Sequence, residues 1–161
     1  MDTFEKKKIA EIVAREIAQS SKNFGFKFTL EKACELIDHV LAEAKRIGVK
    51  GVAAVCDAGG NVKAVKCMDD SYIASYDIAV NKAYTAVALK MTTKELSSLA
   101  LPGASLYGIQ YTNGGKIVIF GGGVPLKSGD EIFGGFGISG GTEEQDTYLG
   151  DYAAKQFEKL I

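Results

Sequence analysis

The amino-acid sequence predicts one α/β domain in which an antiparallel sheet of about five strands lies between helices. Apolar residues recur at helical spacing in several segments, as they do along amphipathic helices. Between those segments, β-prone runs are joined by short turns rich in Gly, Asn and Asp, and such turns link antiparallel neighbours. The 161 residues, 47% of them hydrophobic, suffice for one core and are too few for two ordinary domains.

Helices are expected in five segments: residues 3–20, 30–47, 71–90, 93–99 and 142–160. Thr29 is a suitable N-cap for the second helix, which Gly48 ends. Thr142 and Gln145 form a capping box at the start of the last helix. The apolar side of the third helix comprises Ile73, Tyr76, Val80, Ala83, Tyr84 and Val87.

Strands are expected around two hairpin turns and in one further apolar run. The first hairpin occupies residues 52–68 and turns at Asp57–Asn61, where several residues tolerate positive φ. The apolar run Lys116–Phe120 predicts a separate strand. A second hairpin turns at Ser128–Asp130, and Pro125 in it suits an edge strand or a strand start.

Charge and cysteine content exclude several classes of partner. The chain carries 19 basic and 20 acidic residues, so it has no general field that would attract nucleic acid or anionic lipid. The N-terminal segment lacks the apolar core of a signal peptide, and no stretch is apolar enough to cross a membrane. Cys34, Cys56 and Cys67 are odd in number and widely spaced, which disfavours a disulfide framework or a zinc site. We therefore expect a cytoplasmic protein with no nucleic-acid or membrane partner.

Two glycine motifs resemble nucleotide-binding sequences and fail on closer inspection. Gly135–Gly140 matches G-x-G-x-x-G, yet a dinucleotide-binding unit needs a second parallel strand and an acidic residue about 20 positions on. Gly114–Lys116 resembles the end of a P-loop, but Gln110 stands where that loop needs glycine. No nucleotide cofactor is expected.

The last predicted strand has one face with almost no side chains. Alternation places one set of residues on one face, Ile132, Phe136 and Ile138, and another on the opposite face, Phe133, Gly135, Gly137 and Ser139. A face reduced to hydrogens admits close approach, either by a packed helix or by the flat surface of a ligand.

Candidate ligand-binding residues lie in the third helix and in the triple-glycine loop. Asp77 falls within or beside the apolar side of the helix, one turn before Asn81, whereas Lys82 points away from that side. A buried carboxylate needs partners, so these residues either brace the helix against the glycine loops or line a pocket. Gly121, Gly122 and Gly123 form either an anion nest for a carboxylate or propionate, or a sharp crossing between sheet segments.

His39 is the one histidine of the chain, so any Ser-His-Asp or Cys-His catalysis would have to involve it. Helical spacing places it almost opposite the apolar side of the second helix, where a solvated surface residue is expected. The functional alternative is an axial ligand of haem iron, which requires an oligomer partner to cover that face.

Four segments follow one another along the chain: DAGGNVKAV, S-x-x-x-A-x-x-KAYTA from Ser75, TNGGKIVIFGGGVPL and GGFGISGGTEEQD. In this order they resemble the GlcG/HbpS family of haem-binding or haem-degrading proteins, also called PduO C-terminal-like. The resemblance runs from about Thr29 to Ile161, so residues 1–161 are expected to form a single domain with residues 1–24 as a helical extension. It implies a profilin-like α/β/α sandwich, a homo-oligomer and, in some members, haem binding and slow haem degradation.

Three functional hypotheses follow from these residues and from the resemblance. The first is a tetrapyrrole-binding protein with haem near the third helix and the glycine loops, and with His39 or a hydroxyl side chain near the iron. The second is a non-haem binding or accessory protein for a small carboxylate or a corrinoid in glycolate or diol utilisation. The third is an enzyme that acts on a small hydroxy acid or aldehyde.

Overall fold

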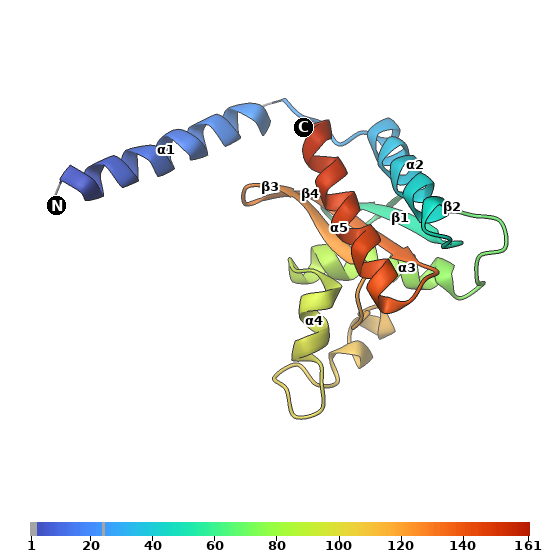
Figure 1. Ribbon diagram of the computed structural model, residues 1–161. Helices are drawn as coiled ribbons and strands as arrows, with labels where there is room; N and C mark the ends of the chain where they lie inside the picture. Colours follow the sequence, from blue (N-terminus) through green and yellow to red (C-terminus); the bar gives the residue numbers. More distant parts are fainter. Residues whose placement is uncertain (1–2, 24) are drawn as a thin grey trace.

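The computed structural model describes residues 3–23 and 25–161, so the predicted extension over residues 1–24 is described without residues 1, 2 and 24. Figure 1 shows the arrangement of its helices and strands. In chain order they are α1 (Thr3–Asn23), α2 (Leu30–Arg46), β1 (Val52–Asp57), β2 (Val62–Cys67), α3 (Ser75–Leu89), α4 (Thr93–Leu99), β3 (Gly123–Ser128), β4 (Glu131–Ser139) and α5 (Glu143–Leu160). Two short 3-10 helices, Ile109–Tyr111 and Asn113–Gly115, precede β3.

The sheet is antiparallel and has four strands in the order β2-β1-β4-β3. Both predicted hairpins are confirmed, and Pro125 lies in β3 at the edge of the sheet, where its missing N–H is tolerated. The prediction of a further strand over Lys116–Phe120 is wrong. The N–H of Val118 donates to the hydroxyl of Thr85 in α3 at 3.0 Å. This backbone group therefore finds its hydrogen-bond partner on α3 and not on a neighbouring strand.

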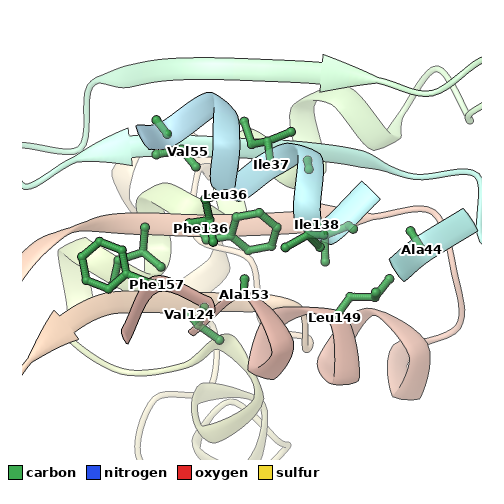
Figure 2. Close-up of a cluster of buried hydrophobic side chains, with 14 of the residues drawn as sticks. Leu36, Ile37, Ala44, Val55, Val124, Phe136, Ile138, Leu149, Ala153 and Phe157 are labelled. Atoms are coloured by element: carbon green, nitrogen blue, oxygen red, sulfur yellow. The ribbon is translucent and has the colours of Figure 1, made fainter. Parts of the chain in front are cut away.

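Two layers of helix enclose the sheet. On one face, α2 and α5 pack against β4, and Figure 2 shows Phe136 and Ile138 among apolar side chains of both helices. Phe157 of α5 meets Phe28 edge to face, with ring centroids 5.2 Å apart. The predicted alternation of β4 is therefore confirmed for Phe136 and Ile138. It is wrong for Phe133, which packs against this same core with its ring centroid 5.1 Å from that of Phe26, next to the point where the pairing with β3 shifts register.

On the other face, α3 lies directly on the glycines of β4. A Cβ atom on Gly137 would lie 2.1 Å from the carbonyl oxygen of Ala79, and one on Gly135 would lie 2.3 Å from that of Ala83. Only hydrogen fits at these two positions. The bare face of the strand is thus filled by a packed helix and not by a ligand.

The close approach also determines which side of α3 is buried. The inner side consists of the mainly small residues Ser75, Ala79, Lys82, Ala83, Thr85 and Ala86. The sequence predicts an apolar side made mostly of larger residues, but Ile73 is 97% exposed and Tyr76 is also exposed. Large side chains would hold the helix away from a strand of glycines, so small residues form the contact.

The helix ends follow the predicted capping signals. Thr29 caps α2 by accepting a hydrogen bond from the N–H of Lys32. Thr142 and Gln145 form the expected reciprocal capping box of α5. Figure 1 shows α1 extending away from the sheet and its covering helices. None of the helices over residues 3–23 and 25–161 is long and apolar enough to span a membrane.

We expect Gly137→Ala to lower the free energy of unfolding by about 3 kcal/mol, because the added methyl group overlaps the backbone of α3. Urea denaturation measures this change. Val62→Ala, at an exposed position of β2, is the control and should change stability by about 0.5 kcal/mol or less. Equal effects of the two substitutions would contradict the close packing of α3 on β4.

Candidate functional site

A buried ion pair joins α3 to the first turns of α5. Lys82 Nζ lies 2.8 Å from Asp146 Oδ2, and the two side chains are 0% and 6% exposed. The ammonium group also donates to the carbonyl oxygen of Ile138 at 2.8 Å, while Asp146 Oδ1 accepts from the N–H of Gly141 at 2.9 Å. The pair therefore connects α3, the C-terminal end of β4 and α5.

Burial and pairing act in opposite directions on the charge of Lys82. Burial lowers the pKa of the Lys82 ammonium, and the adjacent Asp146 carboxylate opposes that change. The ring of Phe120 supplies further stabilisation, because its centroid lies 4.9 Å from Lys82 Nζ. A carboxylate, a carbonyl oxygen and an aromatic face thus surround the cation.

The triple-glycine loop leaves the space that this arrangement needs. A Cβ atom on Gly122 would lie 2.8 Å from both Lys82 Nζ and the carbonyl oxygen of Ile138. Gly122 also has a φ of 113°, in a region that L side chains rarely adopt. A side chain at Gly122 would therefore collide with the ion pair and strain the backbone.

The amides of the loop bond largely within the chain. The N–H of Gly123 donates to Thr93 Oγ1 at 2.9 Å, and that of Gly121 donates to Glu143 Oε1 at 3.5 Å. All three glycines are buried. Of the two alternatives that the sequence left open, this geometry favours a close crossing over an anion nest.

A pocket of about 390 Å³ adjoins the ion pair (Asp146 itself forms part of its wall). Its lining comes from the start of α3, the end of β4, the start of α5 and Phe120: Tyr72, Ala74, Ser75, Ile78, Phe120, Ser139, Gly140, Gly141, Glu143 and Asp146. Inside it, the hydroxyl of Ser139 donates to that of Ser75 at 3.1 Å. The pocket combines apolar and aromatic walls with a few polar groups, which is typical of small-molecule sites.

The α5 side of the pocket is acidic. A hydrogen bond from Lys94 Nζ, 3.0 Å from Glu143 Oε1, is the main cause that holds the pKa of Glu143 below its usual value. Asp146 adds a second carboxyl group to the same wall. Both carboxylates have a lysine counter-charge, Glu143 from Lys94 and Asp146 from Lys82, which offsets their repulsion of an anionic ligand group.

Two further hollows continue from the pocket along the end of the sheet. The nearer, about 240 Å³, shares Tyr72, Gly140 and Gly141 with it and adds Lys50. The farther, about 500 Å³, includes Lys45 and Lys50. Asp70 lines both hollows and binds Lys50 Nζ at 2.7 Å, and Asp69 lines the farther one, so the hollows carry side chains of both charges.

The structure separates the residues that the sequence grouped as ligand-binding. Lys82 lies with Gly121–Gly123 at the ion pair. Asp77 is exposed and Asn81 half-buried on the outer side of α3, and neither lines the pocket. The predicted orientations of Asp77 and Lys82 are therefore wrong, because the small residues of α3 and not its large apolar ones face the sheet. His39 is exposed on α2, in the helical layer opposite α3, as expected for a surface residue.

Asp146 is the residue of the candidate site to which the sequence analysis assigns no role. It is one of three acidic residues at the start of α5. Two features of the sequence could have indicated its role. Asp146 lies in the first turns of a helix that directly follows a glycine-rich strand, and Lys82 lies in a helix with many small residues. Such a lysine, buried against glycines, needs a counter-charge from a neighbouring element.

The four-stranded antiparallel sheet with helices on both faces defines an α/β/α sandwich with a pocket at one end of the sheet. The family model of the haem degrading protein HbpS-like family matches residues 28–155. The chain belongs to this family.

Three related proteins show how similar the chain is to known members. A 15.0 kDa protein from the dhaT-dhaS intergenic region of Citrobacter freundii is 46% identical over 132 residues, which cover 82% of this chain and 93% of that protein. The corrinoid adenosyltransferase PduO of the same organism is 35% identical over 91% of this chain, but the match spans only 44% of PduO. The crystal structure of a PduOC:heme complex superposes with a TM-score of 0.77 at 35% identity, covering 84% of this chain and 96% of that one.

Lys82→Met should destabilise the protein by about 3–5 kcal/mol, because it leaves the carboxylate of Asp146 buried without a counter-charge. Chemical denaturation measures the loss. The double variant Lys82→Met/Asp146→Leu removes both charges and should recover most of the stability. The single variant Asp146→Leu completes the comparison. If the losses of stability in Lys82→Met and Asp146→Leu simply add in the double variant, Lys82 and Asp146 are not coupled as described.

Proposed function

We propose that the protein is a cytoplasmic haem-binding protein that acts as a homo-oligomer, with the tetrapyrrole at the pocket between α3 and the glycine loops. The observation that carries this proposal is the 35% identity and TM-score of 0.77 to a domain whose crystal structure is a haem complex. Membership of the HbpS-like family supports it. Degradation of bound haem is the activity that the family description suggests.

The residues around the pocket fit a tetrapyrrole in three respects. Phe120 and Ile78 offer apolar contacts for a flat macrocycle, and the pocket opens into further hollows that extend the available space. Tyr72 is part of the pocket lining, and Tyr is one of the residues that hold haem iron in proteins. Haem propionates would face Lys45 in the farther hollow, because Lys50 is already paired with Asp70.

We favour Tyr72 over His39 as the iron ligand, since Tyr72 lines the pocket. His39 lies on α2, on the other side of the sheet from α3 and the pocket. It would approach a haem only in an oligomer whose second copy covers the outer side of α2. Tyr72 corresponds to the alternative of a hydroxyl side chain near the iron.

Titration with hemin tests the proposal, and a shifted Soret band that saturates at one haem per chain is the expected result. Tyr72→Phe should change the position of that band, whereas His39→Ala should leave it unchanged. Tyr111→Phe is the matched control, because Tyr111 is an exposed tyrosine outside the pocket. Absence of a shifted Soret band at stoichiometric loading would contradict haem binding, and loss of the band in His39→Ala would reassign the ligand.

A second candidate function is an accessory role toward a corrinoid. The match to the corrinoid adenosyltransferase PduO of Citrobacter freundii favours it, although the chain spans less than half of that protein. A small carboxylate is less well supported, because the amides of Gly121 and Gly123 already have partners within the chain. Calorimetric titration with cobalamin distinguishes the two roles: heat of binding with cobalamin and none with hemin would favour the accessory function.

A further inference from the structure

Two serine hydroxyls meet at the wall of the pocket beside the ion pair. Ser75 is the first residue of α3 and Ser139 is the last residue of β4, and their hydroxyl oxygens lie 3.1 Å apart. The two residues are only 3% and 6% exposed, yet both line the pocket of about 390 Å³. We call them the serine pair.

The serine pair has one more hydroxyl hydrogen than it uses. Each serine hydroxyl carries one donor hydrogen, and only one hydrogen can lie between the two oxygens. Among residues 3–23 and 25–161, no other group forms a hydrogen bond with either hydroxyl. Because buried hydroxyl groups are nearly always hydrogen-bonded, this free donor at a pocket wall indicates a bond to a molecule that enters the pocket.

The start of α3 adds the positive end of a helix to the same wall. Its N-cap residue, Ala74, has no side chain that could accept from the first N–H groups of the helix. Ala74, Ser75 and Ile78 line the pocket, whereas the acidic residue of the first turn, Asp77, does not. A ligand oxygen that accepts hydrogen bonds is therefore favoured at this wall.

The α5 wall of the pocket supplies hydrogen-bond acceptors. Each carboxylate oxygen of Asp146 accepts one bond within the chain and has a second lone pair. Glu143 accepts through Oε1, from Lys94 Nζ and the N–H of Gly121, and its Oε2 accepts from none of the described residues. A ligand group that donates hydrogen bonds is therefore favoured at this second wall.

We propose that this pocket binds a small neutral polyol, a compound with hydroxyl groups on adjacent carbon atoms. A hydroxyl group accepts, as the serine pair requires, and also donates, as Asp146 and Glu143 require. A carboxylate cannot donate to the α5 wall, and an ammonium group cannot accept from the serine pair.

The charges around the pocket also favour a neutral ligand. Asp146 is paired with Lys82, and Glu143 is paired with Lys94. No lysine, arginine or histidine of the described residues lines the pocket, so an anion finds no unpaired positive charge there.

The apolar part of the lining suits the carbon atoms of such a ligand. Phe120 and Ile78 contribute an aromatic ring and an aliphatic side chain to it. The inference goes beyond haem binding, because it assigns a second class of ligand to the pocket when no tetrapyrrole is bound. A polyol and a tetrapyrrole would contact the same walls and therefore compete.

An NMR titration of the haem-free, 15N-labelled full chain with glycerol tests the proposal. The amide signals of Ser75, Ser139, Gly140 and Gly141 should shift and saturate at a concentration on the order of 1–10 mM, since so small a ligand binds weakly. Ser75→Ala/Ser139→Ala should weaken glycerol binding about tenfold, because it removes the hydroxyl donor. Ser98→Ala, at an exposed position of α4 outside the pocket, is the matched control and should leave binding unchanged.

Three related compounds test the class of ligand. Glycerate carries a carboxylate, n-propylammonium carries a positive charge, and n-propanol has a single hydroxyl group. All three should bind severalfold more weakly than glycerol. Tighter binding of glycerate or n-propylammonium would overturn the assignment of a neutral ligand, and equal binding of n-propanol would reduce the site to apolar contact.

A second variant keeps the test decisive if the double serine variant does not fold. Glu143→Gln preserves the size of the side chain but replaces a carboxylate acceptor with an amide, so it should weaken glycerol binding severalfold. Shifts that grow without saturation, or binding that neither the serine substitutions nor Glu143→Gln weakens, would overturn the proposal. The hemin titration is a separate measurement, so failure of polyol binding and failure of haem binding are distinguishable.

Discussion

A lysine ammonium group inside a protein needs a counter-charge and hydrogen-bond acceptors, and Lys82 obtains both from segments far away in the sequence. Asp146 supplies the charge and Ile138 the carbonyl oxygen. These partners can meet Lys82 only if α3 lies directly on β4 and if α5 begins immediately after the strand. The glycines at 135, 137 and 122 are the sequence requirement for that approach, because side chains there would overlap α3 or the ammonium group.

The same constraint places the pocket. Asp146 and Glu143 stand on its wall because the ion pair holds the start of α5 against the end of β4. Phe120 lines the pocket and also faces the Lys82 ammonium, so the ligand site and the buried pair share a side chain. A substitution at the ion pair therefore affects the pocket by direct contact, without a chain of intermediate residues.

Much of the fold could be predicted from the sequence, because local signals determine it. Caps at Thr29 and Thr142, the turn at Asp57–Asn61 and the alternation of β4 are readable without knowledge of tertiary contacts. The Lys116–Phe120 segment resembles a strand in composition, but only Ile117 and Val118 in it are buried and the N–H of Val118 bonds to Thr85 of α3. Composition does not distinguish such a segment from a strand paired in a sheet. The site was harder to predict, since the orientation of α3 depends on a partner strand of glycines and Asp146 is paired with a residue 64 positions away.

The charge state of Lys82 is the most direct test of this account. NMR of protein labelled with 15N at the lysine side chains should show one ammonium signal whose protons exchange slowly at neutral pH, since Lys82 Nζ is buried and hydrogen-bonded. Asp146→Asn should abolish that protection or convert the group to a neutral amine. A Lys82 ammonium that exchanges as fast as those of exposed lysines, or that is already neutral in the unsubstituted protein, would contradict a buried ion pair as the contact that holds α3, β4 and α5 together.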